Sequence, residues 1–235
     1  SVSASRLSLF LQCRLKFYFR YVAEIAKPTS PALFVGSSVH GALKRWNKSR
    51  WRGTPLAPEQ LQSAFQLAWE EGDPAAVSWD DDLDKHQSMA WSLVQTYVRE
   101  TPISATAKPD AVEVPVEADL TAHGLPTLIG ILDLVQSGTI VEFKTSASTP
   151  SQDGSLHLHS TQTATYAVLF RAATERTESG VEIHTLVKLK TPKLVIAQAP
   201  PVSEAQRLRL FRLMESYVDG LERRDWVPSA GLQCS

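Results

Sequence analysis

The chain has 235 residues, of which 43% are hydrophobic and 21% are charged. This composition is typical of a globular protein and excludes a disordered or fibrous chain. The net charge of −1 argues against a passive nucleic-acid coat protein, although an enzyme can concentrate positive charge in one groove. We find no apolar run that could cross a membrane and no signal peptide, so we expect a single-domain cytoplasmic protein without a membrane partner.

The first predicted helix covers residues 3–22, where apolar residues follow helical spacing behind a serine cap. Lys16 and Arg20 lie four positions apart among aromatic residues, a combination that could stack on or clamp a nucleic-acid strand. The alternative is an ordinary amphipathic helix, which the residues alone favour. We expect Pro28 and Pro31 to end this helix.

A second helix is expected to run to Trp46, with Gly36–Ser38 as its cap. His40 lies at the margin of its apolar stripe, near the N-terminal end. From the residues alone, a histidine in this position is more often a hydrogen-bonded packing residue than a metal ligand.

Residues 51–110 contain no functional motif, and their apolar spacing predicts two helices. We interpret this segment as a helical insertion that covers one side of the core. Strand character resumes at residues 111–120, where Glu113 and Glu117 alternate with valines and Pro115 fits an edge strand. Both glutamates could be the solvated face of that strand.

Residues 130–145 predict two strands joined by a tight turn at Ser137–Gly138, because β-branched runs flank a turn dipeptide. A two-residue turn pairs Val135 with Ile140 across the hairpin. This hairpin carries the main concentration of candidate catalytic side chains.

The same register places Asp133 directly opposite Glu142, and Lys144 shares their face of the sheet. Opposed residues have Cβ atoms about 5 Å apart, so two carboxylates there repel unless one is protonated or a cation lies between them. A hard divalent ion held by oxygen ligands fits this arrangement. The alternative is a hairpin edge with three solvated charges, which is disfavoured because the carboxylates interrupt an apolar surface.

Together these elements predict an α/β fold with a central mixed sheet from residues 111–145 and 181–198. Helices at residues 159–174 and 203–223 are expected to flank the sheet. The helices of residues 1–101 form an N-terminal helical portion that packs around it.

Asp133, Glu142 and Lys144 resemble the catalytic pattern of the PD-(D/E)XK nuclease superfamily. The start of the chain resembles the RecB-like nucleases, which include nuclease domains of bacterial recombination complexes and CRISPR adaptation nucleases. Arg14 stands where many of these relatives have proline. The residues that carry this second resemblance are Ser3, Ser5, Leu7, Phe10, Leu11, Cys13, Lys16, Phe17, Tyr18, Phe19, Arg20 and Tyr21.

The resemblance implies a restriction-endonuclease-like core with a catalytic metal ion. Asp133 and Glu142 would hold Mg²⁺ or Mn²⁺, and the Phe143 carbonyl and His40 would complete the ligand shell. A neutral imidazole among carboxylates favours manganese over magnesium. Lys144 would orient or stabilise the attacking water.

Two further motifs of the RecB-like family occur in the sequence. Gly36 and His40 match its Gly-x-x-x-His motif, which reverses the interpretation of His40 as a packing residue. Gln162 and Tyr166 match its Gln-x-x-x-Tyr motif, which implies that they line the DNA groove. An acidic residue often lies near the site in the strand of Glu113, so Glu113 is a weaker candidate.

Cys13 and Cys234 match the outermost two of the four cysteines that hold a [4Fe–4S] cluster in many RecB-like nucleases. The sequence contains two cysteines, and two thiolates cannot supply four ligands. A cluster would therefore require further cysteines beyond this sequence.

We expect residues 1–235 to form a single RecB-like nuclease domain, with residues 111–223 as its catalytic core. The expected function is metal-dependent cleavage of DNA by an exonuclease or end-processing nuclease in recombination or repair. The sequence has no GxxxxGK[ST] phosphate loop, so a helicase or other recombination partner would lie on another chain. The alternatives are a catalytically silent nuclease fold that binds DNA or scaffolds a complex, and, less favoured, a paired-carboxylate sugar hydrolase.

Overall fold

The computed structural model describes residues 1–80 and 82–229. In this part of the chain, six strands form one mixed sheet in the order β1-β3-β4-β5-β6, with β2 paired to the outer edge of β3. Neighbours pair antiparallel at β2–β3, β3–β4 and β5–β6 and parallel at β1–β3 and β4–β5. The strands are β1 (Val2–Ser3), β2 (Ala111–Ala118), β3 (Leu128–Gln136), β4 (Thr139–Ser146), β5 (Gly180–Val187) and β6 (Lys193–Ala199).

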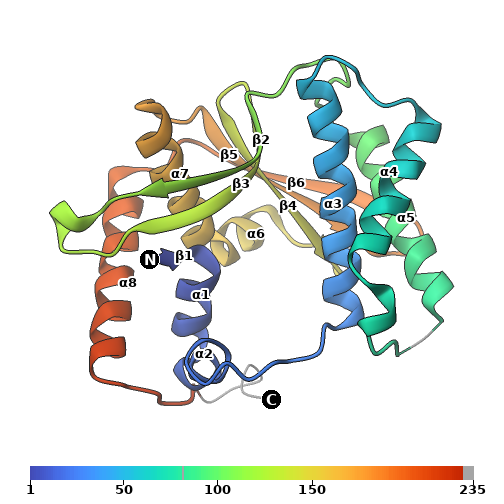
Figure 1. Cartoon of the computed structure of the whole chain (residues 1–235). Helices are drawn as coiled ribbons and strands as arrows, with labels where there is room; N and C mark the ends of the chain where they lie inside the picture. The colour runs from blue at the N-terminus through green and yellow to red at the C-terminus, as the bar shows by residue number, and fades with distance from the viewer. Residues whose placement is uncertain (81, 230–235) are drawn as a thin grey trace.

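The described residues form eight α-helices around this sheet. Figure 1 shows α3, α4 and α5 together on one side, whereas α1, α7 and α8 gather near β2 and β3. The expected α/β fold with flanking helices is confirmed. The helices are α1 (Ala4–Gln12), α2 (Arg14–Tyr21), α3 (Pro31–Trp51), α4 (Pro58–Glu71), α5 (Leu83–Glu100), α6 (Gln152–Leu158), α7 (Ser160–Thr174) and α8 (Glu204–Glu222).

Two hydrophobic cores lie on opposite faces of the sheet, as alternation along the strands predicts. Val135 and Ile140 belong to the core shared with α1, α7 and α8. Leu134, Val141 and Phe143 belong to the core shared with α3, α4 and α5. The hairpin therefore separates the two layers and carries its charged residues on the α1–α7 side of the sheet.

The start of the chain differs from the single helix expected there. Ser3 caps α1 as predicted, but Cys13 adopts an extended backbone with φ −162° and separates α1 from α2. This break lets Phe10 and Phe17 meet edge-to-face at 5.4 Å, and each ring also packs against Tyr217 of α8. Packing of these aromatic side chains outweighs continuity of the helix.

The second helix begins earlier than the predicted cap. Ser30 caps α3 by accepting a hydrogen bond from the Leu33 amide, and Pro31 occupies the first turn, where proline is well tolerated. Pro31 therefore starts a helix instead of ending one, and Gly36–Ser38 lie inside it. The segment after Pro150 contains the short helix α6.

The hairpin register is confirmed near the turn and wrong at Asp133 and Glu142. Ser137 and Gly138 both have positive φ, which is the two-residue turn expected, and Val135 pairs with Ile140. Pairing between β3 and β4 ends at Leu134–Val141, so Asp133 and Glu142 are not a ladder pair. The N-terminal end of β3 pairs instead with β1. β3 and β4 therefore diverge at Asp133.

The two ends of the described chain lie close together. Trp226 packs against Phe17 and Tyr18 of α2, and Arg14 forms an ion pair with Asp225. Cys13 is buried at the junction of α1 and α2. Cys234 lies outside the described residues. None of the helices within residues 1–80 and 82–229 is long and apolar enough to span a membrane.

Candidate active site

Asp133 lies at the fork where β3 and β4 separate. Its Oδ2 accepts a 3.0 Å hydrogen bond from the Phe143 amide. Because β3 and β4 no longer pair at this point, the amide has no backbone carbonyl of β3 to bind. Burial raises the pKa of Asp133 to about 6, and the negative charge of Glu113 adds to this effect. The Asp133 carboxylate is therefore poorly solvated when it is ionised.

Glu142 is the most deeply buried of the candidate carboxylates. Its Oε1 accepts hydrogen bonds from Lys144 Nζ at 2.6 Å and from Gln162 Nε2 at 2.7 Å. Its buried Oε2 has no hydrogen-bond partner among the residues the structure describes. Burial, followed by the charge of Asp133, raises the pKa of Glu142 to about 7. A positive charge beside Oε2 would stabilise the ionised form of Glu142 and give this oxygen a partner.

His40 reaches the fork from α3. Its Nδ1 lies 3.5 Å from Asp133 Oδ2, and its ring packs edge-to-face against the Phe143 ring at 6.0 Å. Burial lowers the pKa of His40 below its usual value, which favours the neutral imidazole that binds metal ions.

Glu113 enters from β2, at the position across from Asp133 in the β2–β3 register. Its φ of +51° lies in the left-handed region, and Glu113 and Asp133 are missing from an otherwise regular ladder. This backbone turns the carboxylate towards the fork, where Lys44 Nζ lies 3.4 Å away. Potential ligand atoms of His40, Glu113 and Asp133 all lie within 4.8 Å of one another.

These residues fit a divalent cation. Asp133 and Glu142 with raised pKa values, a neutral imidazole and the unpartnered Oε2 of Glu142 are hard or borderline ligands for such an ion. The structure groups Glu113 with His40 and Asp133, whereas the sequence favoured Glu142. The left-handed backbone of Glu113 has no sequence signature, so the sequence alone ranks Glu113 as a weaker candidate.

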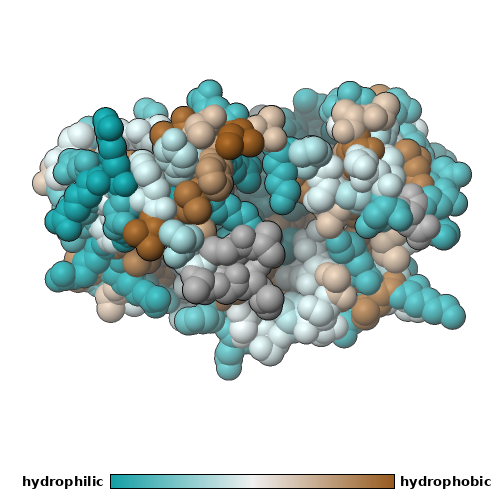
Figure 2. Space-filling model, turned by 90° about the horizontal axis from the view of Figure 1, so that it is seen from below, coloured by the Kyte–Doolittle hydropathy of each residue, from teal (hydrophilic) through white to brown (hydrophobic). Residues whose placement is uncertain are grey.

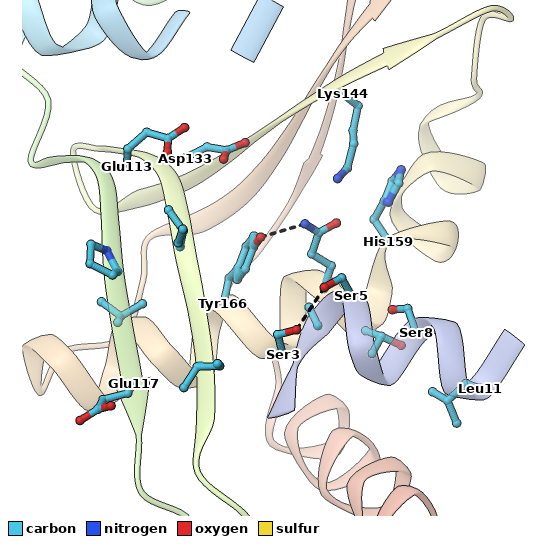
Figure 3. Close-up of a pocket in the computed structure, with 18 of the residues that line it drawn as sticks. Ser3, Ser5, Ser8, Leu11, Glu113, Glu117, Asp133, Lys144, His159 and Tyr166 are labelled. Carbon is cyan, nitrogen blue, oxygen red and sulfur yellow. Dashed lines mark hydrogen bonds between the residues drawn. The ribbon is translucent and has the colours of Figure 1, made fainter. Parts of the chain in front are cut away.

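A groove of about 1310 Å³ runs from this site along β2 and β3. Figure 3 shows Lys144 and His159 on one side of the groove and Asp133 and Glu113 on the other, with the serines of α1 farther along. Figure 2, seen from below, shows the molecule hollowed between the α1–α2 side and the α3 side. The groove therefore leads from the surface to the candidate catalytic groups.

Helix α7 lies against β3 because Gly130 leaves room for it. A Cβ at Gly130 would stand 2.7 Å from Leu169 Cδ1 of α7. This close approach brings Gln162 and Tyr166 to the groove, where Gln162 Nε2 donates to Tyr166 Oη at 2.9 Å. The predicted Gln and Tyr pair thus faces the site.

The sequence profile of the PD-(D/E)XK nuclease superfamily matches residues 1–235. The chain belongs to this superfamily. Asp133 and the run Glu142–Lys144 resemble the catalytic pattern of this superfamily, and the Asp133 carboxylate and the Lys144–Glu142 ion pair lie at the fork between β3 and β4.

One solved structure shares the overall fold of this chain. A Eubacterium rectale protein described as a "putative exonuclease" superposes with a TM-score of 0.66 and 14% identity, covering 99% of this chain and 86% of its own. A second structure, described as SSO0001, reaches a TM-score of 0.35 with 14% identity, covering 90% of this chain and 84% of its own. No curated protein matches the sequence.

Not all predicted site residues of this PD-(D/E)XK domain meet at the fork. Lys16 and Arg20 lie on α2 and are not among the described residues that line the groove. Conversely, no motif singles out His159, which lies between α6 and α7. Burial, with a smaller contribution from the charge of Lys144, lowers the pKa of His159 to about 4, so a neutral imidazole faces the groove.

Proposed function

We propose that this protein is a metal-dependent deoxyribonuclease that hydrolyses phosphodiester bonds at the β3–β4 fork. The observation that carries this proposal is the convergence of His40, Glu113 and Asp133 next to Lys144, at the end of an open groove. Mg²⁺ or Mn²⁺ would be held by these three ligands, with Glu142 and the Phe143 carbonyl on the same side of the fork.

When bound, the metal supplies Lewis-acid activation of water and of the phosphate group. The protein's own part is to position the reacting groups. The Lys144 ammonium, fixed by Glu142 Oε1, orients the attacking water and stabilises negative charge on the phosphate. Gln162 donates to the same carboxylate oxygen and therefore limits the orientations that Lys144 and Glu142 can adopt.

We further propose a RecB-like exonuclease or end-processing role in recombination or repair. The sequence motifs Gly36-x-x-x-His40 and Gln162-x-x-x-Tyr166 support it, and so does the similarity in fold to the E. rectale protein. Gln162 and Tyr166 would contact DNA in the groove. Lys16 and Arg20 would contact DNA farther along the molecule, and a helicase or recombination partner would act from another chain.

An iron–sulfur cluster is the least supported cofactor. The position of Cys13 beside the end of the described chain suits such a cluster, as does the packing of Trp226 on α2. The sequence contributes Cys13 and Cys234, so a [4Fe–4S] cluster would need further cysteines from beyond it.

The direct test is degradation of end-labelled linear DNA by the purified protein with Mn²⁺, Mg²⁺ or EDTA. We expect degradation with a divalent ion and none with EDTA. The Asp133→Ala variant should be inactive under all three conditions. Metal-dependent cleavage at equal rates by wild type and Asp133→Ala would contradict the proposal, and DNA binding without cleavage would favour a silent scaffold.

A further inference from the structure

A row of positive charges follows one face of α3 away from the candidate active site. Lys44, Lys48 and Arg52 are spaced four residues apart, or about 6 Å per step along a helix, and Arg45 lies beside them. Residues 25–58 contain no acidic residue, although the whole chain has 25 acidic and 24 basic residues. Positive charge is therefore concentrated on this helix.

This basic row lines a hollow of about 630 Å³ between α3 and α4. The α4 wall contributes mainly uncharged residues and one acidic residue, Glu71, which is paired with Arg45. A second hollow of about 650 Å³ shares Lys44 with the first and reaches His40 and Lys144; its other charged lining residues are Lys188 and one acidic residue, Glu113. The row is thus continuous with the proposed catalytic site.

Part of the row has no ion pair. Lys44 is near Glu113 at 3.4 Å and Arg45 binds Glu71, but neither Lys48 nor Arg52 forms an ion pair with any residue in 1–80 or 82–229. A helix dipole favours cations near the C-terminal end of α3 and accounts for their position along the axis. It does not account for their alignment on the face that leads to the site.

The groove along β2 and β3 has the opposite character. Of the described residues that line it, only Lys144 is a cation, whereas Glu113, Glu117 and Asp133 are acidic. Much of its remaining lining is apolar or hydroxyl-bearing. A polyanion would therefore meet favourable charge on the α3 side of the fork and unfavourable charge in the groove.

We propose that the phosphodiester backbone of the substrate lies along α3 from Arg52 to Lys44 and enters the active site from that side. This inference rests on the proposed nuclease function, because it assumes that a nucleic acid is the substrate. Each cation would neutralise one phosphate without reading sequence, so binding should depend strongly on salt.

The test compares Lys48→Gln/Arg52→Gln with Arg209→Gln/Arg212→Gln. The control pair lies on α8, where both arginines are exposed, and removes the same two charges. Affinity for a labelled oligonucleotide is measured in EDTA over a range of NaCl concentrations. We expect the α3 pair to bind several-fold more weakly. Its slope of log K against log [NaCl] should be smaller by about 1.4 for a single strand or about 1.8 for a duplex.

Hydrolysis of a small chromogenic phosphodiester with Mn²⁺ separates this inference from the proposed function. The ester is too short to reach from the fork to Lys48 and Arg52, so Lys48→Gln/Arg52→Gln should hydrolyse it like wild type. If wild type cleaves neither the ester nor DNA, the nuclease proposal fails. The binding measurements in EDTA still decide whether Lys48 and Arg52 contact nucleic acid. The inference is overturned if the α3 pair keeps the wild-type affinity and slope, or if the α8 pair loses as much.

Discussion

The Phe143 amide donates a 3.0 Å hydrogen bond to the Asp133 carboxylate at the point where β3 and β4 stop pairing. A side chain thus replaces a backbone acceptor and ends the hairpin. The replacement places Asp133 between Glu113 on β2 and Glu142 on β4. The separation of the strands and the formation of the candidate metal site are therefore one structural event.

Replacing Asp133 by Asn should abolish cleavage without weakening the fold. Asn retains an oxygen that can accept from the Phe143 amide but removes a buried charge. We expect DNA cleavage to fall by about 10³-fold or more. In EDTA the variant should melt at the wild-type temperature or above it, because repulsion from Glu113 and Glu142 is relieved. A large loss of thermal stability would show that the negative charge itself holds the fork.

Glu113 and Glu117 offer a matched pair on one strand, since both line the groove and only Glu113 lies beside His40 and Asp133. Glu113→Gln should weaken Mn²⁺ binding by about 10-fold or more, because it removes one anionic ligand. Glu117→Gln should leave it unchanged. Mn²⁺ titration followed by tryptophan fluorescence measures both. Equal affinity in the two variants would remove Glu113 from the ligand set.

His40→Ala tests whether the imidazole is a ligand or a packing residue. As a ligand, its loss should raise the Mn²⁺ concentration needed for half-maximal cleavage. His157→Ala, at an exposed position on α6, should leave that concentration unchanged. A variant with reduced melting temperature but unchanged metal dependence would show that His40 serves packing alone.

Glu142 should make the metal-free protein less stable as the pH rises. Its pKa is raised to about 7 in the folded state, so the protonated side chain is favoured by folding. The stability associated with this proton is fully present below about pH 4.5 and is lost as the pH rises through about 7. Relative to wild type, Glu142→Gln should gain stability over this range, by up to about 3 kcal/mol. Urea unfolding in EDTA at pH 4.5 and pH 8 measures the change. A constant difference between the two proteins would contradict the raised pKa.

Local patterns predicted the parts of the fold that local forces determine. Alternating β-branched residues and a turn dipeptide predicted the hairpin around Ser137–Gly138, and apolar spacing predicted α4 and α5. The break at Cys13 was not predictable, because it depends on Phe10 and Phe17 packing against Tyr217, about two hundred positions later in the chain.

The same distinction applies to the site. Short motifs singled out Asp133, Glu142 and Lys144 as candidates because these residues lie on one hairpin. The fork that brings Glu113 into the group depends on β1 docking beside β3 and on a left-handed backbone in β2. Both are tertiary features. The register extrapolated from the turn therefore holds as far as Leu134 and fails at Asp133.

The short pairing between β3 and β4 also has a mechanical consequence. Three residue pairs join these strands, whereas β4 and β5 pair along eight. The sheet therefore consists of two plates connected by a narrow joint, with Asp133 and Glu113 on one plate and Lys144 on the other. A small rotation at the joint would change the separation of these candidate catalytic groups, and a nucleic-acid strand in contact with both plates would hold them at a fixed spacing.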